Sequence, residues 1–325
     1  MNSLEHVQHI IGSLDWNREP ANLYAPIAYA MQSGGKRLRP QLVLMAADLF
    51  GGVNNDVISA AAAIEIFHNF TLLHDDVMDN APTRRGRPTV HIRWDANTAI
   101  LSGDQMLIEA YKHISNISEN KLPQALALFN RVATEVCEGQ QMDMDLERLM
   151  LEDAGAGILD KYLTMIRLKT SVLLATALHL GAFLAGASEE DCSRLYNYGI
   201  NTGIAFQIED DMLDVYGDES VFGKTLGGDI QVNKKTFLLL SAFRKATGQQ
   251  RSRLLALLND RTLTREDKFI AVKDIYDSLD IRHETLDAIR RYTISALDCL
   301  AEVNADRTAK QPLITFAEQL MQRQV

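Results

Sequence analysis

Apolar residues recur at helical spacing through nearly the whole chain, and alternation of the strand type is scarce. The 7 prolines fall mostly where helices would begin or end. This pattern predicts one or two amphipathic helices over residues 1–31. It predicts further helices at about 40–50, 57–79, 97–116, 122–149, 157–187 and 191–216, and amphipathic helices over 237–325.

No linker rich in Pro, Gly or Ser divides the chain, and no repeat of fixed period is present. We therefore expect residues 1–325 to form a single all-α domain with ten or more helices. The longer helices should form a bundle around a central cavity.

Composition and charge limit the classes of protein and of partner that the chain fits. The 325 residues are 46% hydrophobic and 23% charged, as in ordinary globular proteins. The net charge of −10 argues against nucleic acid or an anionic membrane as a partner. The apolar run 171–187 contains His179 and two glycines, which favours a buried helix over a membrane span. Cys137, Cys192 and Cys299 match no metal or disulfide spacing, and residues 1–20 do not read as a signal peptide, so we expect a cytoplasmic protein.

Two copies of Asp-Asp-x-x-Asp are the most informative feature. On a helix, such a motif places its three carboxylates within an arc of roughly 100°. The motifs comprise Asp75, Asp76 and Asp79, and Asp210, Asp211 and Asp214. Crowded like charges are destabilising unless a cation lies between them, and carboxylates without Cys or His suit Mg²⁺ shared with phosphate oxygens. A lone copy is usually a solvated acidic face, but two matched copies in apolar surroundings favour a metal and diphosphate site.

Basic residues stand near these motifs, each with two interpretations. Lys36, Arg37 and Arg39 precede a helix opened by Pro40, which fits an anion site or a basic surface loop. Arg84 and Arg85 follow the first motif and could bind phosphate or neutralise the carboxylates. Lys169 lies in an apolar stripe, where it could reach solvent or face a buried anion. His68 is the histidine of interest, about two turns before the first motif, and we treat the other seven as structural.

Six segments between residues 34 and 236 together resemble the trans-isoprenyl diphosphate synthases (polyprenyl synthetases), the family of farnesyl and geranylgeranyl diphosphate synthases. These are Gly-Gly-Lys-Arg-Leu-Arg-Pro, the first Asp motif with Arg-Arg-Gly-Arg-Pro-Thr-Val-His, Gly-Gln-Gln-Met-Asp, Lys169-Thr170, Phe-Gln-Ile-Glu-Asp-Asp-Met-Leu-Asp and Asn-Lys-Lys-Thr. The resemblance implies an all-α bundle of the isoprenoid synthase type, usually a homodimer, with a deep central active-site cavity.

The resemblance also implies roles for the residues at matching positions. The six aspartates of the two motifs would be the metal ligands, with three Mg²⁺ ions bound together with the allylic diphosphate. Arg84, Lys169, Lys224 and Lys234 would contact that diphosphate. Lys36, Arg39, His68 and Arg85 would bind isopentenyl diphosphate. Thr170 and Gln207, with Lys169, would act at the developing carbocation.

The implied function is a prenyltransferase of isoprenoid biosynthesis that condenses an allylic diphosphate with isopentenyl diphosphate. The allylic C–O bond ionises, the isopentenyl double bond attacks the cation, and a proton is lost. Phe70 and Thr71 stand five and four residues before Asp75, where large residues of the family form the floor of the product cavity. An aromatic residue followed by a small one resembles the geranylgeranyl-type enzymes, so we predict a C20 product, with C15 as the second choice. Phe70 could also be ordinary core.

Two other functions stay open at this stage. A class I terpene cyclase also uses Asp-Asp-x-x-Asp, but its second metal motif normally has Asn/Ser/Glu character, and it needs no second diphosphate pocket. A non-catalytic subunit of a heteromeric prenyltransferase usually loses part of an Asp motif, whereas both are intact here. A purely structural helical protein would leave the two acidic clusters unexplained.

Overall fold

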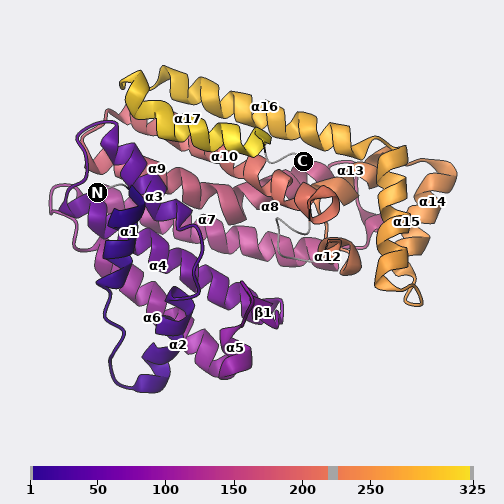
Figure 1. Ribbon diagram of the computed structural model, residues 1–325, viewed down its shortest axis with the longest axis horizontal. Coiled ribbons are helices and arrows are strands. Elements are labelled where there is room, and N and C mark those ends of the chain that lie inside the picture. The colour runs from indigo at the N-terminus through magenta and orange to yellow at the C-terminus, as the bar shows by residue number, and fades with distance from the viewer. Residues whose placement is uncertain (1–2, 219–225, 323–325) are drawn as a thin grey trace. The chain divides into compact units, whose positions relative to one another are not determined.

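The computed structural model describes residues 3–218 and 226–322, and helices make up most of it (Figure 1). The predicted all-α class, with ten or more helices, is confirmed. The longer helices are α2 (Ala21–Met31), α3 (Leu38–Asp48), α4 (Asn55–Met78), α6 (Ala96–Ile114), α7 (Leu122–Arg148), α9 (Val172–Leu184), α10 (Glu189–Tyr216), α14 (Gly248–Asn259), α15 (Arg265–Ser278), α16 (Ile281–Glu302) and α17 (Arg307–Gln322). Shorter ones are α1 (Ser3–Gly12), α5 (Val90–Arg93), η1 (Leu151–Asp153), α8 (Ile158–Ile166), α12 (Gly228–Gln231) and α13 (Phe237–Lys245).

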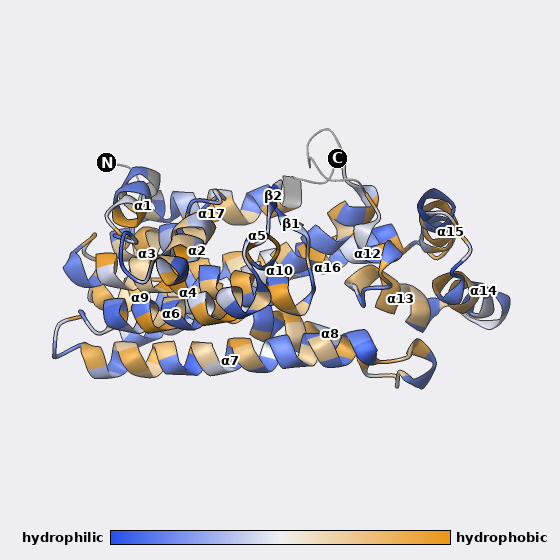
Figure 2. Cartoon of the chain, turned by 90° about the horizontal axis from the view of Figure 1, so that it is seen from below, coloured by the Kyte–Doolittle hydropathy of each residue, from blue (hydrophilic) through white to orange (hydrophobic). Residues whose placement is uncertain are grey.

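The sequence encodes several of the helix starts directly. The side chains of Asn54 and Asp95 accept hydrogen bonds from Val57 N (3.0 Å) and Thr98 N (2.8 Å), which caps α4 and α6. Thr236 caps α13 through Leu239 N at 3.3 Å. Figure 2 shows apolar and polar residues alternating along α7, as expected for an amphipathic helix.

Two segments differ from the prediction. The loop expected over 80–91 contains a small antiparallel hairpin, β1 (Thr83–Arg84) with β2 (Arg87–Pro88), followed by α5. The single helix expected over 157–187 is α8, a π-helical turn η2 (Arg167–Ser171) and α9. Periodicity does not reveal either feature, because a two-residue strand and a one-turn change of helix type are shorter than the pattern that defines a period.

The chain divides into two compact units, which we describe separately. The first comprises residues 1–131, 176–196 and 304–309. In it α4 packs chiefly on α6 and α3, with the alanines 60–63 fully or almost fully buried. Small residues let the helices approach closely: a Cβ on Gly103 of α6 would lie 2.2 Å from Nε2 of His74. The motif Asp75–Asp79 therefore lies at the end of a rigid helix.

The second unit comprises residues 132–175, 197–303 and 310–325. Its core gathers buried residues of α8, α10, α13, α15 and α16, among them Tyr162, Ile208, Phe237 and Tyr276. The helix α10 runs through this core and carries the second Asp motif. The single-domain expectation for residues 1–325 stays a prediction.

Two helical stretches, Asn55–Met78 and Ile158–Leu184, are long and apolar enough to cross a membrane by length and composition alone. In each, 61% of the most apolar window is buried inside the protein. The second contains most of the run 171–187, which the sequence assigned to a buried helix. Both are core helices.

Candidate active site

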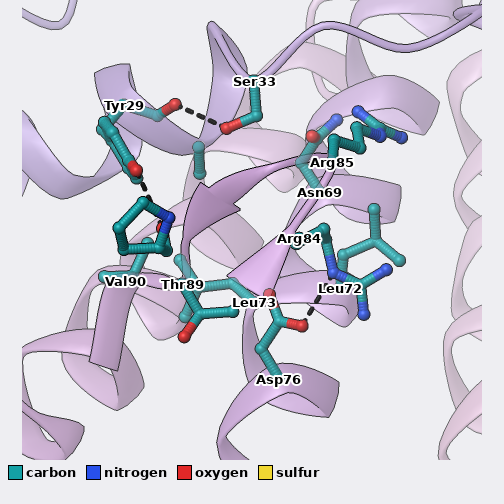
Figure 3. A pocket seen from close by; sticks show the side chains of 12 residues that line it. Tyr29, Ser33, Asn69, Leu72, Leu73, Asp76, Arg84, Arg85, Thr89 and Val90 are labelled. Carbon is teal, nitrogen blue, oxygen red and sulfur yellow. Dashed lines mark hydrogen bonds and ion pairs between the residues drawn. The ribbon is translucent and has the colours of Figure 1, made fainter. Parts of the chain in front are cut away.

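The first Asp motif occupies the last turn of α4 and its end. Asp76 is buried, Asp75 is half-buried and Asp79 is exposed. From the adjacent hairpin, Arg84 donates from Nε to Asp76 Oδ1 at 2.7 Å, and its Nη2 lies 3.4 Å from Asp75 Oδ2 (Figure 3). Burial raises the pKa of Asp76, while Arg84 opposes that shift. In this structure Arg84 therefore neutralises carboxylates, which is one of the two roles left open by the sequence.

A cluster of positive charge surrounds this end of α4. An Arg39 Nη1 atom lies 3.0 Å from His68 Nε2, and Arg85 donates to the carbonyl of Gly34. Burial and the neighbouring Arg85 lower the pKa of Arg39 to about 10, with Glu65 opposing. Burial and the arginines 39, 85, 84 and 37 hold the pKa of His68 well below its usual value. The sequence-predicted residues Arg39 and His68 are thus in contact, with the imidazole neutral, and Arg85 lies near enough to lower the pKa of both. Lys36 lies exposed on the loop before α3.

One member of the basic stretch has a structural partner. Arg37 donates to the buried carboxylate of Glu65 and to the carbonyl of Met31. Asn69 Nδ2 also donates to Glu65 Oε1, at 2.9 Å. Glu65 and Asn69 were missed from the sequence, although a charged residue in the apolar stretch before the Asp motif was a usable signal. Arg37 is thus held by Glu65, whereas Arg39 contacts His68.

A pocket on this unit is lined by Asn69, Leu72, Asp76, Arg84, Arg85 and Tyr29, among others (Figure 3). Its charged lining consists of one carboxylate and two guanidinium groups. Such a lining suits an anion bridged to a cation.

In the second motif, two of the three aspartates hold the surrounding structure. Asp211 is buried, and its Oδ2 accepts from the Tyr162 hydroxyl at 2.5 Å and from Phe237 N at 2.8 Å. Asp214 accepts from Gly228 N at 3.1 Å and Asp229 N at 3.0 Å, at the start of α12. Asp210 is exposed. The assignment of all six aspartates to metal stays a prediction, and these contacts give Asp211 and Asp214 an additional structural role.

The two described lysines that were predicted to contact the allylic diphosphate, Lys169 and Lys234, lie beside carboxylates in the second unit. Lys169 Nζ donates to Asp143 Oδ2 at 2.6 Å, and Lys234 Nζ lies 3.5 Å from Asp229 Oδ1. Burial opposes protonation of Lys234, but Asp229, Asp211 and Asp143 raise its pKa above the usual value. Asp143 closes the Gly-Gln-Gln-Met-Asp segment, to which the sequence gave no role. Lys224, the remaining predicted contact, lies outside the described residues.

Thr170 and Gln207, to which the resemblance gives a role at the carbocation, lie in hydrogen-bond contact, and that role stays a prediction. Thr170 Oγ1 donates to Gln207 Oε1 at 3.2 Å, and Gln207 Nε2 donates to Asp211 Oδ1 at 3.3 Å. These two bonds fix which end of the amide faces Thr170. Thr170 lies in the π-helical turn η2, and π turns recur at functional sites. Gly139 permits the turn, because a Cβ there would lie 2.3 Å from Lys169 N.

Phe70 and Thr71, the predicted product-length residues, lie one turn above the first motif. The Phe70 ring is 9% exposed and contacts Phe67 and His74, at centroid distances of 5.5 and 4.8 Å. The Thr71 hydroxyl donates to the His68 carbonyl at 2.8 Å. Phe70 is therefore held between two rings on its own helix.

The donor set fits a divalent cation that is shared with a phosphorylated ligand. Both motifs offer carboxylate oxygens alone, the chemistry that Mg²⁺ prefers. Among residues 3–218 and 226–322, no three Cys, His, Asp or Glu side chains gather closely enough to hold a metal by themselves. Ligand oxygens would therefore complete the coordination shell.

A helical fold with two Asp motifs, a half-buried lysine beside each of two carboxylates and an arginine cluster defines a diphosphate-handling helical enzyme. The polyprenyl synthetase family model matches residues 20–276. The geranylgeranyl diphosphate synthase of Methanosarcina mazei is 40% identical over 247 residues, covering 75% of this chain and 74% of its own length. A crystal structure of geranylgeranyl pyrophosphate synthase is 42% identical, covers 100% of both chains and superposes with a TM-score of 0.91.

A polyprenyl synthase from Caulobacter crescentus CB15, crystallised with calcium and isoprenyl diphosphate, is 30% identical with a TM-score of 0.86, covering 99% of this chain and 95% of that one. The chain belongs to the polyprenyl synthetase family. It is a prenyltransferase, a class whose members bind a divalent metal with diphosphate substrates. The terpene cyclase and structural alternatives therefore lose their support.

Proposed function

We propose that the protein is a short-chain prenyl diphosphate synthase that condenses an allylic diphosphate with isopentenyl diphosphate to give a C20 all-trans product. The observation that carries the proposal is the cluster of Arg39, Arg85 and His68. Burial lowers the pKa of both Arg39 and Arg85, and repulsion by neighbouring arginines adds to the shift, from Arg85 on Arg39 and from Arg37 and Arg84 on Arg85, so positive charge outweighs negative charge in the cluster. A diphosphate bound there would relieve that repulsion.

The chain's own residues supply separate functions in this reaction. Lys36, Arg39, His68 and Arg85 bind the isopentenyl diphosphate. Arg84, Lys169, Lys224 and Lys234 bind the allylic diphosphate, and Arg84 must exchange part of its contact with Asp76 for phosphate oxygens. Thr170 and Gln207 direct oxygen dipoles at the allylic cation, and Asp211 keeps the Gln207 amide in that orientation. The departing diphosphate accepts the proton lost in the last step.

Mg²⁺ fits the carboxylates of Asp75, Asp79 and Asp210, with Asp76, Asp211 and Asp214 completing the two motifs. Three bound ions would neutralise the charge that develops on the leaving diphosphate. Enclosure in an apolar site would protect the cation from water.

Product length follows from the position of Phe70. It stands five residues before Asp75, or roughly 7–8 Å along the helix axis. An aromatic side chain that is already packed between Phe67 and His74 cannot easily move away from a growing chain. We therefore assign C20, with C15 as the second choice.

The decisive experiment is an assay with radiolabelled isopentenyl diphosphate, each allylic diphosphate in turn and Mg²⁺, followed by analysis of product length. A C20 product supports the proposal. Cyclic hydrocarbon without incorporation of the label would favour a terpene cyclase. Binding of both substrates without turnover, restored by a second chain, would favour a non-catalytic subunit.

We also propose a cytoplasmic homodimer. Ile100, Leu101 and Ile108 fall within roughly 100° of arc on α6 and are 44%, 60% and 51% exposed. A grouped apolar surface favours burial against another chain. Light scattering after size exclusion should give twice the chain mass for the wild type, and Leu101→Glu with Ile108→Glu should give the monomer. Cys137, Cys192 and Cys299 are free thiols, as expected in a reducing compartment.

A further inference from the structure

The hairpin that carries Arg84 and Arg85 is too small to be stable alone. Each strand has two residues, paired as Thr83 with Pro88 and Arg84 with Arg87. Arg85 and Gly86 form the connecting turn, with φ of 53° and 73°, as a two-residue turn of type I′ requires. Isolated two-stranded hairpins are marginally stable at best in water. Contacts from elsewhere must therefore fix the two arginines.

The helix α2 supplies these contacts through one side chain, Tyr29. Its hydroxyl donates to the Pro88 carbonyl at 2.8 Å (Figure 3). Its ring lies under two guanidinium groups, with Cζ of Arg87 at 4.0 Å and Cζ of Arg93 at 4.4 Å from the centroid. The ring of Trp94 meets it edge-on at 5.4 Å. Tyr29 is only 8% exposed, so these contacts are largely shielded from water.

Tyr29 thus contacts the segment after the turn at three successive points, namely β2, α5 and the residue that ends α5. Pro88 is the cross-strand partner of Thr83, and Arg87 is the partner of Arg84. Because β1 is paired with β2, contacts that fix β2 also fix β1. The hairpin has a second attachment in Thr89, whose hydroxyl donates to the Ala81 carbonyl at 2.7 Å and so closes its base.

We propose that Tyr29 is a positioning residue: its contacts with β2 and α5 set Arg84 and Arg85 for diphosphate binding. This inference rests on the proposed function, because its kinetic test uses the substrates proposed there. The physical basis is preorganisation: guanidinium groups already held in the binding geometry lose less conformational freedom on binding a diphosphate. Loss of Tyr29 should therefore weaken diphosphate binding and leave the chemistry of the bound state largely unchanged.

The test compares Tyr29→Phe, which removes only the hydroxyl, with Tyr29→Leu, which also removes the ring. Tyr24→Leu is the matched control, because Tyr24 is on the same helix but its ring lies under Arg18, at 5.4 Å. We expect KM for isopentenyl diphosphate to rise about threefold in Tyr29→Phe and about thirtyfold in Tyr29→Leu, with kcat within twofold of wild type. Tyr24→Leu should leave both constants unchanged.

Titration with inorganic pyrophosphate by calorimetry measures the same effect without turnover. Its affinity should fall in parallel with the rise in KM. If the wild type binds pyrophosphate and Tyr29→Leu weakens that binding, the positioning role holds even where the enzyme forms no prenyl product. The proposed function and the proposed role of Tyr29 can therefore fail separately.

A double variant with Arg85→Ala separates positioning from a general loss of stability. If Tyr29 acts through Arg85, Tyr29→Phe should raise KM and weaken pyrophosphate binding little further in a protein that already carries Arg85→Ala. Because Tyr29→Phe is the milder change, it can still be measured if Tyr29→Leu does not fold. The proposal is overturned if Tyr29→Phe and Tyr29→Leu lower the melting temperature alone while KM and pyrophosphate affinity stay at wild-type values. It is equally overturned by full additivity with Arg85→Ala.

Discussion

The hydroxyl of Tyr162 donates to Asp211 Oδ2 at 2.5 Å, and this contact joins α8 to the second Asp motif on α10. The same oxygen accepts from Phe237 N at 2.8 Å, which adds the start of α13. Burial raises the pKa of Asp211 to about 7, and it also raises that of Tyr162 well above its usual value, as expected for two buried groups that share a hydrogen bond. A residue that belongs to a metal motif by sequence is thus also an anchor for three helices.

The hydrogen bond between Tyr162 and Asp211 predicts that the effects of substituting these two residues on stability are coupled. Asp211→Asn should lower the free energy of unfolding by about 1–3 kcal/mol, and Tyr162→Phe by about 1 kcal/mol, because each removes at least one buried hydrogen bond. In urea denaturation, the double variant should lose less free energy of unfolding than the two single variants lose together. Tyr198→Phe is the control, since its hydroxyl donates to the Leu313 carbonyl at 2.7 Å and should add independently to Asp211→Asn. A rise in stability of Asp211→Asn would contradict the anchor and indicate simple relief of repulsion between carboxylates.

The aspartates of the two motifs should respond differently to neutral replacement. Asp75→Asn should reduce turnover at least about 100-fold, because it removes charge that holds Mg²⁺ and diphosphate. It should change the free energy of unfolding by less than about 1 kcal/mol. Asp214→Asn should lose turnover and also about 1–3 kcal/mol of stability, because Asp214 accepts from two backbone amides. Undiminished activity of Asp75→Asn, or of wild type in EDTA-treated buffer, would rule out the metal assignment.

The cations should divide between the two substrates. Arg39→Ala and Lys36→Ala should each raise KM for isopentenyl diphosphate roughly thirtyfold, which corresponds to about 2 kcal/mol for a lost charged hydrogen bond. Lys169→Ala and Lys224→Ala should chiefly weaken the allylic substrate. Steady-state kinetics with each substrate varied in turn distinguishes these patterns, and exposed Lys112→Ala serves as the control for loss of charge. One common pattern in both sets would refute the division.

Phe70→Ala should shift the product to C25 or longer, with little change in affinity for isopentenyl diphosphate. Removal of the ring opens space below the first motif. Phe129→Leu is the control, because that ring packs on Phe67 at 5.4 Å and Tyr111 at 5.1 Å within the core and should affect stability instead. Chromatography of the dephosphorylated products gives the answer, and a wild-type product length for Phe70→Ala would place the floor elsewhere.

Stability should fall below neutral pH because of His179. Burial, with a smaller contribution from Arg131, lowers the pKa of His179 to about 4, from a usual value of 6.5. The unfolded chain therefore binds a proton more readily, so the full stability present above pH 6.5 is lost as the pH falls toward 4. At pH 5 the cost is about 2 kcal/mol, and His179→Leu should lose correspondingly less between pH 7.5 and 5 in urea titrations. An unchanged pH dependence in His179→Leu would contradict this account.

The sequence was a good guide wherever local chemistry decides structure. The helical period located α4 and α10 to within two residues. The family resemblance grouped Arg39 with His68, and the structure places Arg39 Nη1 3.0 Å from His68 Nε2. It did not reveal which polar groups would pair with each other. The bond from Tyr162 to Asp211 joins residues 49 positions apart, and nothing local in either segment specifies it. The partners of Arg84 and Lys169 depend in the same way on tertiary packing.

The π-helical turn Arg167–Ser171 has a consequence for how this chain tolerates change in length. A π turn holds one more residue than the α-helical turn it replaces. Deleting one residue there would remove the extra residue and restore regular α-helix. The buried side chains of α9, Val172 to Leu178 among them, would keep about their present faces, because the π turn already absorbs the extra residue. A deletion would instead take Lys169 and Thr170 out of the widened turn that places them beside Asp143 and Gln207, so we infer that the turn serves the site rather than the packing of α9.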